Sequence, residues 1–209
     1  MATIEDRGQG NVIDLPADIP GKLEIAIHGH RNRVRIGAGS RFPRATLEIR
    51  GNDCRIDIGE GCVLIGEFRC RESRTELVIG DATTSMNLKI TMHEAGRITI
   101  GDDCMFSGDV RMDVSDMHSI IDVASGLRIN PPADIAIGRH VWVGYGVYVM
   151  KGVSIGPDCV VGACSVVTHD VPANSLAVGT PAKVIRGGIT WDRKCLPMDA
   201  SVGTVARSA

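Results

Sequence analysis

The sequence predicts an all-β protein built as a parallel β-helix solenoid, and three observations support this fold class. Residues 137–172 divide without a gap into six hexapeptides, each opened by an aliphatic residue. Ile-Gly pairs mark a similar but longer repeat earlier in the chain. Aromatic residues make up only 3% of the 209 residues, whereas 25 are glycine. A six-residue period fits neither a helix nor an exposed strand, but it is typical of coils made of short parallel strands.

The six hexapeptides predict the core and the corners of the late coils. Three hexapeptides make one triangular coil, so equivalent positions stack at the spacing of neighbouring strands, about 4.7–4.9 Å. We expect the openers and the small or β-branched fifth residues to point inward as aliphatic ladders. Glycine follows four openers, and we place these glycines at corners, where φ is positive or the backbone passes closely. Ordinary strands joined by glycine turns would not give six consecutive matches. The openers are Ile137, Val143, Val149, Ile155, Val161 and Val167.

The earlier repeat is longer and predicts larger coils. Its Ile-Gly markers begin at Ile36, Ile58, Ile79 and Ile100, with separations of 22, 21 and 21 residues (58 − 36, 79 − 58, 100 − 79). We expect the three or four residues in excess of 18 per coil (21 − 18, 22 − 18) to loosen the corners. The first coil is predicted at residues 21–37.

One long insertion interrupts the repeat. The markers Ile100 and Ile137 are 37 residues apart (137 − 100), which leaves about 19 residues beyond one coil (37 − 18). We place this looped-out excursion at about residues 113–134. Long insertions in compact repeats are usually functional or disordered. Because this one contains Ile120 and Leu127 among other apolar residues, we expect it to pack on a neighbouring subunit.

The pattern divides the chain into three parts. Residues 1–10 are expected to form a loose N-terminal lead, and residues 11–186 the β-helix domain. An open solenoid end exposes unpaired strand edges, which must be covered. Residues 187–209, which include Trp191, are therefore expected to form a short cap and then a tail that is disordered beyond about Met198.

Composition and charge exclude several function classes. The formal net charge of −2 gives no general attraction for nucleic acid, and no apolar run approaches the roughly 20 residues of a membrane span. The N-terminal residues lack the apolar stretch of a secretory signal. Seven cysteines occur without a Cys-x-x-Cys pair, and Cys62, Cys104 and Cys159 occupy inward positions. We interpret them as core residues of a cytoplasmic protein that needs no metal.

Two residues stand out as candidates for chemistry. His118 lies where the excursion leaves the coil, and a neutral imidazole there can accept a proton near pH 7. Asp113, Asp116 and Asp122 are close enough in sequence to orient its second nitrogen. The simpler interpretation is a loop histidine hydrogen-bonded to a carbonyl, and it is the one we give to His28, His30, His93 and His140. Trp142 ends its hexapeptide, so its indole should point outward, toward a ligand or into a subunit contact.

Motifs in the second half of the chain resemble a known family. The repeats, the histidine-bearing excursion and the stretch VGACSVVTHDVPANSLAVGTPAKVIR resemble the left-handed β-helix acyltransferases. The segments SDMHSIIDVASGLRIN and DIAIGRHVWVGYGV resemble more narrowly the bacterial O-acetyltransferases that modify capsular polysaccharide and sialic-acid polymers. The resemblance is strong over residues 100–188 and only architectural over residues 11–99. It implies left-handed coils, acetyl-coenzyme A as the donor, a homotrimer, and a carbohydrate hydroxyl as the acceptor.

The resemblance also implies roles for individual residues. His118 matches the family's catalytic base, which deprotonates the acceptor hydroxyl for direct attack on the thioester. Trp142 matches a tryptophan beside that thioester. Tyr145 and Ala163 are 18 residues apart (163 − 145), and they match the edge along which the pantetheine arm lies.

Other matches concern the nucleotide end and the acceptor. Thr168 and His169 match a Thr-Lys pair near the nucleotide, although histidine here replaces the fixed positive charge of lysine. Lys183 and Arg186 match basic positions near the 3′-phosphate, an anion that charged donors bind well. Asn87 matches, through a loose local alignment, an acceptor-binding asparagine of the sugar acetyltransferases.

Other functions remain open on the sequence. The acceptor could be another small molecule, such as serine, an antibiotic or a nucleotide-sugar amine. The chain could also be a non-catalytic β-helix scaffold, although a scaffold has no reason to hold His118, Trp142 and the TPAKVIR end together. A third class is the γ-type carbonic anhydrases, which use the same solenoid with zinc between subunits. His93, His118 and His140 lie near coil spacing for such a site, but the excursion and the coenzyme-like end argue against it.

Overall fold

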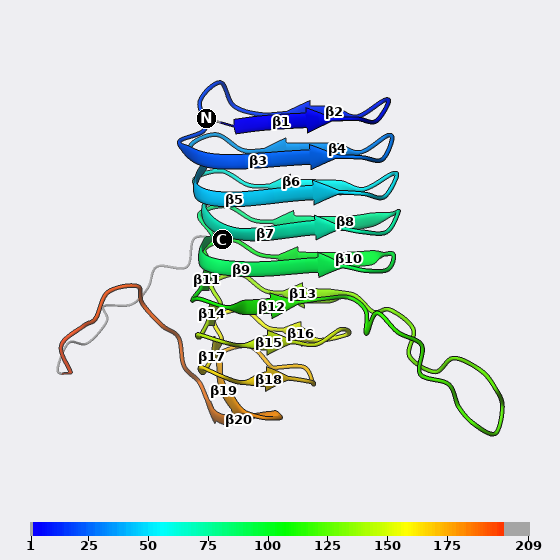
Figure 1. Cartoon of the computed structure of the whole chain (residues 1–209). Coiled ribbons are helices and arrows are strands. Elements are labelled where there is room, and N and C mark those ends of the chain that lie inside the picture. Colours follow the sequence, from blue (N-terminus) through cyan, green and yellow to red (C-terminus); the bar gives the residue numbers. More distant parts are fainter. Residues whose placement is uncertain (1, 199–209) are drawn as a thin grey trace.

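The computed structural model describes residues 2–198, which wind into one parallel β-helix without a helical segment (Figure 1). The predicted all-β solenoid is therefore confirmed. Every strand pairing is parallel except that of the last two strands. The strands are β1 (Ala2–Asp6), β2 (Val12–Asp14), β3 (Gly21–Ile27), β4 (Arg33–Ile36), β5 (Arg41–Ile49), β6 (Arg55–Ile58), β7 (Val63–Cys70), β8 (Thr75–Ile79), β9 (Thr84–Met92), β10 (Gly96–Ile100), β11 (Met105–Phe106), β12 (Val110–Met112), β13 (Ile135–Ile137), β14 (Trp142–Val143), β15 (Tyr148–Val149), β16 (Ser154–Ile155), β17 (Val160–Val161), β18 (Val166–Val167), β19 (Ser175–Gly179) and β20 (Ala182–Gly187).

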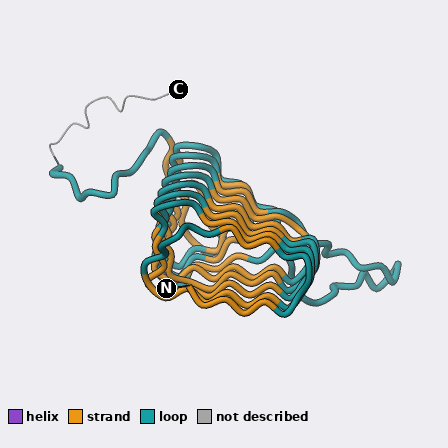
Figure 2. The backbone as a smooth tube through the Cα atoms, turned by 90° about the horizontal axis from the view of Figure 1, so that it is seen from above, coloured by secondary structure: helices purple, strands orange, loops and turns teal. Residues whose placement is uncertain are grey.

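The strands form two sheets that enclose a narrow core, as the view along the coils shows (Figure 2). The larger sheet has 13 strands and the smaller has seven, in the order β16-β13-β10-β8-β6-β4-β2. In the early coils one long strand makes two sides of each coil. β9 is the last of these, because its first part pairs with β11 and its later part with β12. From β11 onward the larger sheet is split by a corner, and the coils become triangular.

The residues that enlarge the early coils lie in strands. β8 covers five residues in the smaller sheet, whereas β16 covers two, and all five residues of β8 are in register with β10. The expectation that these residues loosen the corners is therefore wrong. A strand residue gains ladder hydrogen bonds that a loosened corner would leave unmade, which favours the longer strand.

The glycine of each Ile-Gly pair is required by close stacking. A Cβ on Gly101 would lie 2.6 Å from the Arg139 nitrogen of the next coil, which is closer than real contacts allow. Positive φ instead occurs two residues later, at Asp103 (52°) and His140 (52°) among others. Close backbone stacking therefore occurs at the glycine of each corner, whereas positive φ occurs two residues later. We had expected both at the glycine.

The predicted ladders form the core. All six openers of the late hexapeptides are buried, and so are the three phenylalanines, Phe42, Phe68 and Phe106. Cys62, Cys104 and Cys159 are buried as predicted, and each thiol lies 3.0–3.2 Å from a carbonyl oxygen of the following coil. These cysteines are packing residues with free thiols.

The N-terminal boundary requires a correction. β1 pairs in parallel with β3 over five residues, so the coils begin ahead of residue 11. Residues 2–6 are not a loose lead, because their backbone groups extend the ladder of the larger sheet. Met1 lies outside the described residues.

The long loop and the C-terminal segment leave the solenoid at different places. The loop occupies residues 113–134 between β12 and β13, at the bounds expected, and extends away from the coils (Figure 1). β20 runs antiparallel to β19 and covers its edge. Residues 189–194 then turn back along the side of the solenoid (Figure 1). This corrects the expectation that they cap its end. The expected tail beyond about Met198 lies outside the described residues.

Residues 2–198 contain no helix of the length and apolarity that a bilayer span requires.

Candidate active site

His118 lies in the first turn of the long loop, where its side chain is exposed. Its backbone is held on both sides. The His118 N–H donates to the Asp116 carbonyl at 2.7 Å, and the His118 carbonyl accepts from Asn130 Nδ2 at 2.8 Å. Within residues 2–198 the imidazole has no hydrogen-bond partner. A fixed backbone that carries an exposed, unpartnered imidazole is suited to accept a proton from a bound substrate.

Of the three carboxylates expected to orient His118, Asp122 accepts hydrogen bonds from Ser125, and the other two are also held by other groups. Asp113 pairs with the His93 imidazole, and burial raises the pKa of its carboxyl although His93 opposes this shift. Asp116 forms an ion pair with Lys151 at 2.6 Å, and the hydrogen bond from Lys151 lowers the pKa of Asp116. Within residues 2–198 neither carboxylate contacts the His118 ring. The expected orienting contact is therefore not formed among the residues that the structure describes.

A polar network that the sequence did not reveal fixes the base of the loop. Arg128 donates to both carboxylate oxygens of Glu94, at 2.8 and 2.6 Å, and Ser115 Oγ donates to Glu94 at 2.6 Å. These hydrogen bonds lower the pKa of Glu94 to about 2. Asn130 joins the network through Arg128 and also clamps Asp116 and the His118 carbonyl. The network therefore connects the preceding coil to the backbone of His118.

Trp142 lies on β14 and points outward, as predicted, with 38% of its surface exposed. Its neighbours in the sheet are Met105 on one side and Val160 on the other. Trp191 from the C-terminal segment lies against it, with ring centroids 6.1 Å apart. No residue in the described part of the chain accepts a hydrogen bond from the Trp142 indole, so its N–H is free to donate to a ligand.

Asn87 and Tyr145, which we assigned to different substrates, meet at one carboxylate. Asn87 Nδ2 donates to Asp109 Oδ1 at 2.7 Å, and the Tyr145 hydroxyl donates to Asp109 Oδ2 at 2.8 Å. The hydrogen bond to Asp109 raises the pKa of Tyr145. The Tyr145 ring packs against Gly108, where a Cβ would lie 3.2 Å from the ring. No sequence motif pointed to Asp109. It lies between Asn87 and Tyr145 because the corners of successive coils stack.

The remaining coenzyme candidates lie further along the solenoid. The register of β14 with β17 places Tyr145 and Ala163 on successive coils, and the Cys164 N–H donates to the Tyr145 carbonyl at 2.7 Å. Thr168 Oγ1 and His169 Nδ1 are 2.8 Å apart and both residues are exposed. Lys183 and Arg186 are exposed on β20.

The chain separates His118 from Trp142. The corner that follows Trp142 stacks on the corner before β12, since the Gly146 N–H donates to the Gly108 carbonyl. The loop that carries His118 begins at the other end of β12. The two residues therefore lie at opposite ends of the side formed by β12 and β15, where Figure 1 also places β14 and the loop.

Two of the three histidines considered for zinc, His93 and His140, have other partners. His93 contacts Asp113, while His140 contacts Asp103 and the Trp191 carbonyl. Among residues 2–198 no group of three or more His, Cys, Asp or Glu side chains is arranged to hold a metal ion.

Known proteins resemble the chain in both sequence and structure. The family model of the bacterial transferase hexapeptide (six repeats) matches residues 134–169. The polysialic acid O-acetyltransferase of Neisseria meningitidis is 32% identical over 191 residues, which are 90% of this chain and 89% of that protein. The polysialic acid O-acetyltransferase of Escherichia coli O1:K1 / APEC is 39% identical over 119 residues, which are 57% of this chain but 39% of that protein.

Two solved structures match nearly the whole solenoid. The polysialic-acid-specific acetyltransferase NeuO superposes with a TM-score of 0.84 at 33% identity, covering 92% of this chain and 89% of that one. The polysialic acid O-acetyltransferase OatWY superposes with a TM-score of 0.87 at 30% identity, covering 93% of each chain. The resemblance found in the sequence is confirmed, and the chain belongs to the hexapeptide-repeat O-acetyltransferases.

Proposed function

We propose that the protein transfers the acetyl group of acetyl-coenzyme A to a hydroxyl of a carbohydrate, either a surface polysaccharide or a smaller sugar. The observation that carries this proposal is the match to two polysialic acid O-acetyltransferases over about nine tenths of each chain. The match covers 92–93% of this chain, far more than the residues 134–169 that the family model matches. A scaffold that kept only the coils would not retain the loop with its histidine.

His118 is the base in this proposal. Its neutral imidazole takes the proton of the acceptor hydroxyl while that oxygen attacks the thioester carbonyl of the donor. The tetrahedral adduct then collapses, the carbon–sulfur bond breaks, and the coenzyme thiolate regains a proton from the imidazolium. No acyl-enzyme is required, because the thioester is already activated. The exposed ring and the clamped backbone of His118 support this role.

Trp142 and the edge beside it would hold the donor. The free indole N–H can donate to the carbonyl oxygen as negative charge develops there. Tyr145 and Ala163 lie on successive coils, where the pantetheine arm can run along exposed backbone. Lys183 and Arg186 would meet the 3′-phosphate, and Thr168 with His169 the nucleotide. Asn87 would bind the acceptor from its place beside Asp109.

We propose a homotrimer in which the site is completed between chains. Two observations support it. His118 and Trp142 lie at opposite ends of one side of the coil, so one chain alone does not bring them together. The loop also exposes a run of apolar side chains that a neighbouring subunit would bury. They are Met117, Ile120, Ile121, Val123, Leu127 and Ile129.

We place the protein in the cytoplasm. This proposal rests on the described cysteines, all of which are free thiols, because thiols persist in a reducing compartment. It also rests on the donor, a coenzyme thioester made and used inside cells.

The experiment that tests the function measures thiol release from acetyl-coenzyme A with a panel of acceptors. The panel contains a sialic acid polymer, a neutral polysaccharide, a monosaccharide, serine and an amino sugar nucleotide. Release with a glycan, together with an alkali-labile ester on the product, supports the proposal. Release only with serine or with the amine would overturn it. His118→Ala protein provides the blank for spontaneous hydrolysis.

A further inference from the structure

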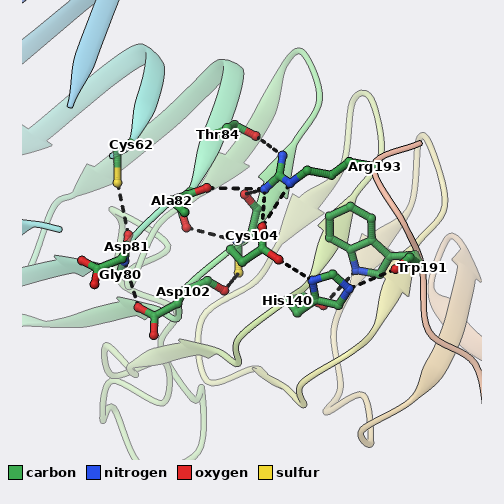
Figure 3. A network of polar contacts seen from close by, with 12 residues as sticks. Cys62, Gly80, Asp81, Ala82, Thr84, Asp102, Cys104, His140, Trp191 and Arg193 are labelled. Carbon is green, nitrogen blue, oxygen red and sulfur yellow. Dashed lines mark hydrogen bonds and ion pairs between the residues drawn. The ribbon is translucent and has the colours of Figure 1, made fainter. Parts of the chain in front are cut away.

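The segment that follows the solenoid folds back beside Trp142. We call residues 189–194 the C-terminal strap. Figure 3 shows two of its side chains, Trp191 and Arg193, directed into the corners of earlier coils. The strap leaves β20 at the end of the solenoid and reaches the coils that carry Asp103 and His140. Because β20 already covers the edge of β19, the strap is not needed to close the solenoid.

Trp191 is fixed by stacking and by two hydrogen bonds. Only 9% of its surface is exposed, and its ring stacks on His140 with centroids 4.3 Å apart and planes 9° from parallel. Its Nε1–H donates to the His140 carbonyl at 2.8 Å. Trp191 nevertheless lies outside the continuous core that the inward ladders form. It is therefore buried against the outer surface of the coils.

His140 binds the strap through its ring as well. Its Nδ1 lies 2.7 Å from Asp103 Oδ2, and its Nε2 lies 3.0 Å from the Trp191 carbonyl oxygen. The two ring nitrogens of His140 thus face one acceptor on the corner and one on the strap. The strap is tied to the corner through the His140 ring as well as through the His140 backbone.

Arg193, two residues after Trp191, is the second side chain that holds the strap on the coils. Its guanidinium donates to Asp103 Oδ1 at 2.8 and 3.0 Å and to Thr84 Oγ1 at 2.9 Å. It also reaches the carbonyls of Ala82 and Cys104, and its Cζ lies 5.5 Å over the Trp191 ring. Arg193 and His140 therefore share the Asp103 carboxylate, one on each oxygen. Such a set of contacts holds a segment in one position, since several donors must be broken to release it.

The fixed Trp191 lies against the ring of Trp142. The two rings are 6.1 Å apart and tilted by 47°. The strand under Trp142 is only two residues long, and its neighbours in the sheet, Met105 and Val160, are partly exposed. Without Trp191, these neighbours would leave Trp142 freer to change its side-chain rotamer.

We propose that the C-terminal strap is a positioning element for Trp142, with Trp191 and Arg193 as positioning residues that do not touch the substrate. Trp191 limits the orientations of the Trp142 indole and so aims its N–H at the reacting carbonyl. Arg193 and His140 hold Trp191 in place. This inference rests on the proposed role of Trp142 in the acetyl transfer.

The contact can be tested without any activity, because the chain has two tryptophans. Trp191→Phe keeps an aromatic ring on His140 and leaves Trp142 as the sole indole. In that background, Arg193→Ala should lower the fluorescence anisotropy of Trp142 and raise its quenching by acrylamide. Lys194→Ala is the matched control, since the Lys194 side chain has no partner among residues 2–198. If Trp142 fluorescence is the same in the Arg193→Ala and Lys194→Ala proteins, the strap does not position it.

The catalytic consequence is tested by a double-mutant cycle between Trp191→Ala and Trp142→Ala. A misplaced catalytic group can lower a rate by one to two orders of magnitude, so we expect Trp191→Ala to reduce kcat about tenfold. The double variant should be no slower than Trp142→Ala, because Trp191 acts through Trp142. Losses that multiply would overturn the proposal. Circular dichroism and melting temperature identify variants that fail to fold, for which Trp191→Phe is the milder replacement.

The cycle also separates this inference from the proposed function. If Trp142→Ala is fully active, the role of Trp142 in acetyl transfer is refuted, and the catalytic role of the strap with it. If Trp142→Ala is slow but Trp191→Ala is as active as the unchanged protein, only the strap inference fails.

Discussion

The early coils, residues 2–104, and the late coils, residues 105–179, share one core but present different outer surfaces. The early strands run for up to nine residues, and several ion pairs join successive coils on their outer face. Two of these pairs join Arg31 to Asp53 and Arg35 to Asp57. The late strands are two or three residues long through β18, so corners make up most of each late coil.

This difference explains where the candidate chemistry lies. A strand residue has its direction fixed by the ladder, and half of its neighbours point into the core. A corner residue projects outward, and equivalent corners stack from coil to coil. Trp142 and Tyr145 lie at or beside such corners, and the loop that carries His118 replaces one of them. The early coils therefore act as a scaffold, whereas the short strands of the late coils give room for a site.

The largest effect is expected at the loop of the late coils. His118→Ala should lower kcat by about 10²–10⁴-fold, the usual contribution of a general base, with little change in the dissociation constant of acetyl-coenzyme A. The variant should keep the melting temperature of the unchanged protein, because the side chain is exposed. Single-turnover rates and coenzyme titration measure the two quantities.

The pH profile gives an independent check on that assignment. Only the neutral imidazole accepts a proton, so kcat/KM should rise with pH along a limb that His118→Ala removes. An active His118→Ala enzyme that keeps the same limb would show that the base lies elsewhere.

In the early coils a substitution should lower the stability of the fold and leave kcat unchanged. Phe68 is fully buried in β7, and Phe68→Ala should destabilise the fold by about 3–5 kcal/mol through the lost burial and the cavity. At a temperature where the variant is folded, its kcat should be unchanged. Urea unfolding and kcat are measured on the same preparation, with Val161→Ala as the matched late-coil variant. A selective loss of kcat in Phe68→Ala would contradict the division into scaffold and site.

The same contrast decides what the sequence could reveal. The hexapeptides from Ile137 onward predicted the late ladders because each short strand contributes one opener. In the early coils the spacing of Ile58 and Ile79 predicted the coils, but it could not show that one long strand makes two sides. The extra residues of the early coils lie in strands because they form ladder hydrogen bonds there, and a residue pattern does not show these bonds directly.

The candidate site was predictable where one residue carries a chemical role. His118 and Trp142 were proposed from their place in the repeat and from the family resemblance, and their chemical roles stay predictions. Glu94, Asp109 and Arg193 were not proposed, because their partners are 21 to 111 residues away in the chain. The stacking of coils brings these residues together, and no local motif reports it.

A smaller effect is expected at the end of the solenoid. Lys183→Ala and Arg186→Ala should each weaken acetyl-coenzyme A binding, by about 1.5–3 kcal/mol for a lost hydrogen bond to a charged group. The melting temperature should hardly change, since both side chains are exposed on β20. Calorimetric titration with the coenzyme and with its 3′-dephospho analogue measures the loss. Equal losses for the two donors would mean that these residues do not bind the 3′-phosphate.

The smallest effect is expected at Glu94, which belongs to the last early coil but binds the loop of the late coils. Its pKa is lowered to about 2 by Arg128 and Ser115. A lowered pKa stabilises the folded arrangement above the ordinary glutamate pKa of about 4.3, and this stabilisation is lost as the pH falls through about 2. Protection of the loop amides 119–130 from hydrogen exchange, corrected for intrinsic rates, should therefore decrease in acid.

Glu94→Gln should remove that dependence. At neutral pH the variant should already show the lower protection, because the amide cannot pair with the Arg128 guanidinium in the same way, and kcat should fall a few-fold as His118 loses its support. Glu72→Gln is the matched control, since Glu72 lies 22 residues earlier (94 − 72) and its carboxylate accepts from the Ser73 N–H rather than from the loop. The proposed link between Glu94 and the loop would be contradicted by one result. This is that loop protection falls in acid in the Glu94→Gln protein as it does in the unchanged protein. The early coils would then be a scaffold for the core alone, without a hold on the loop.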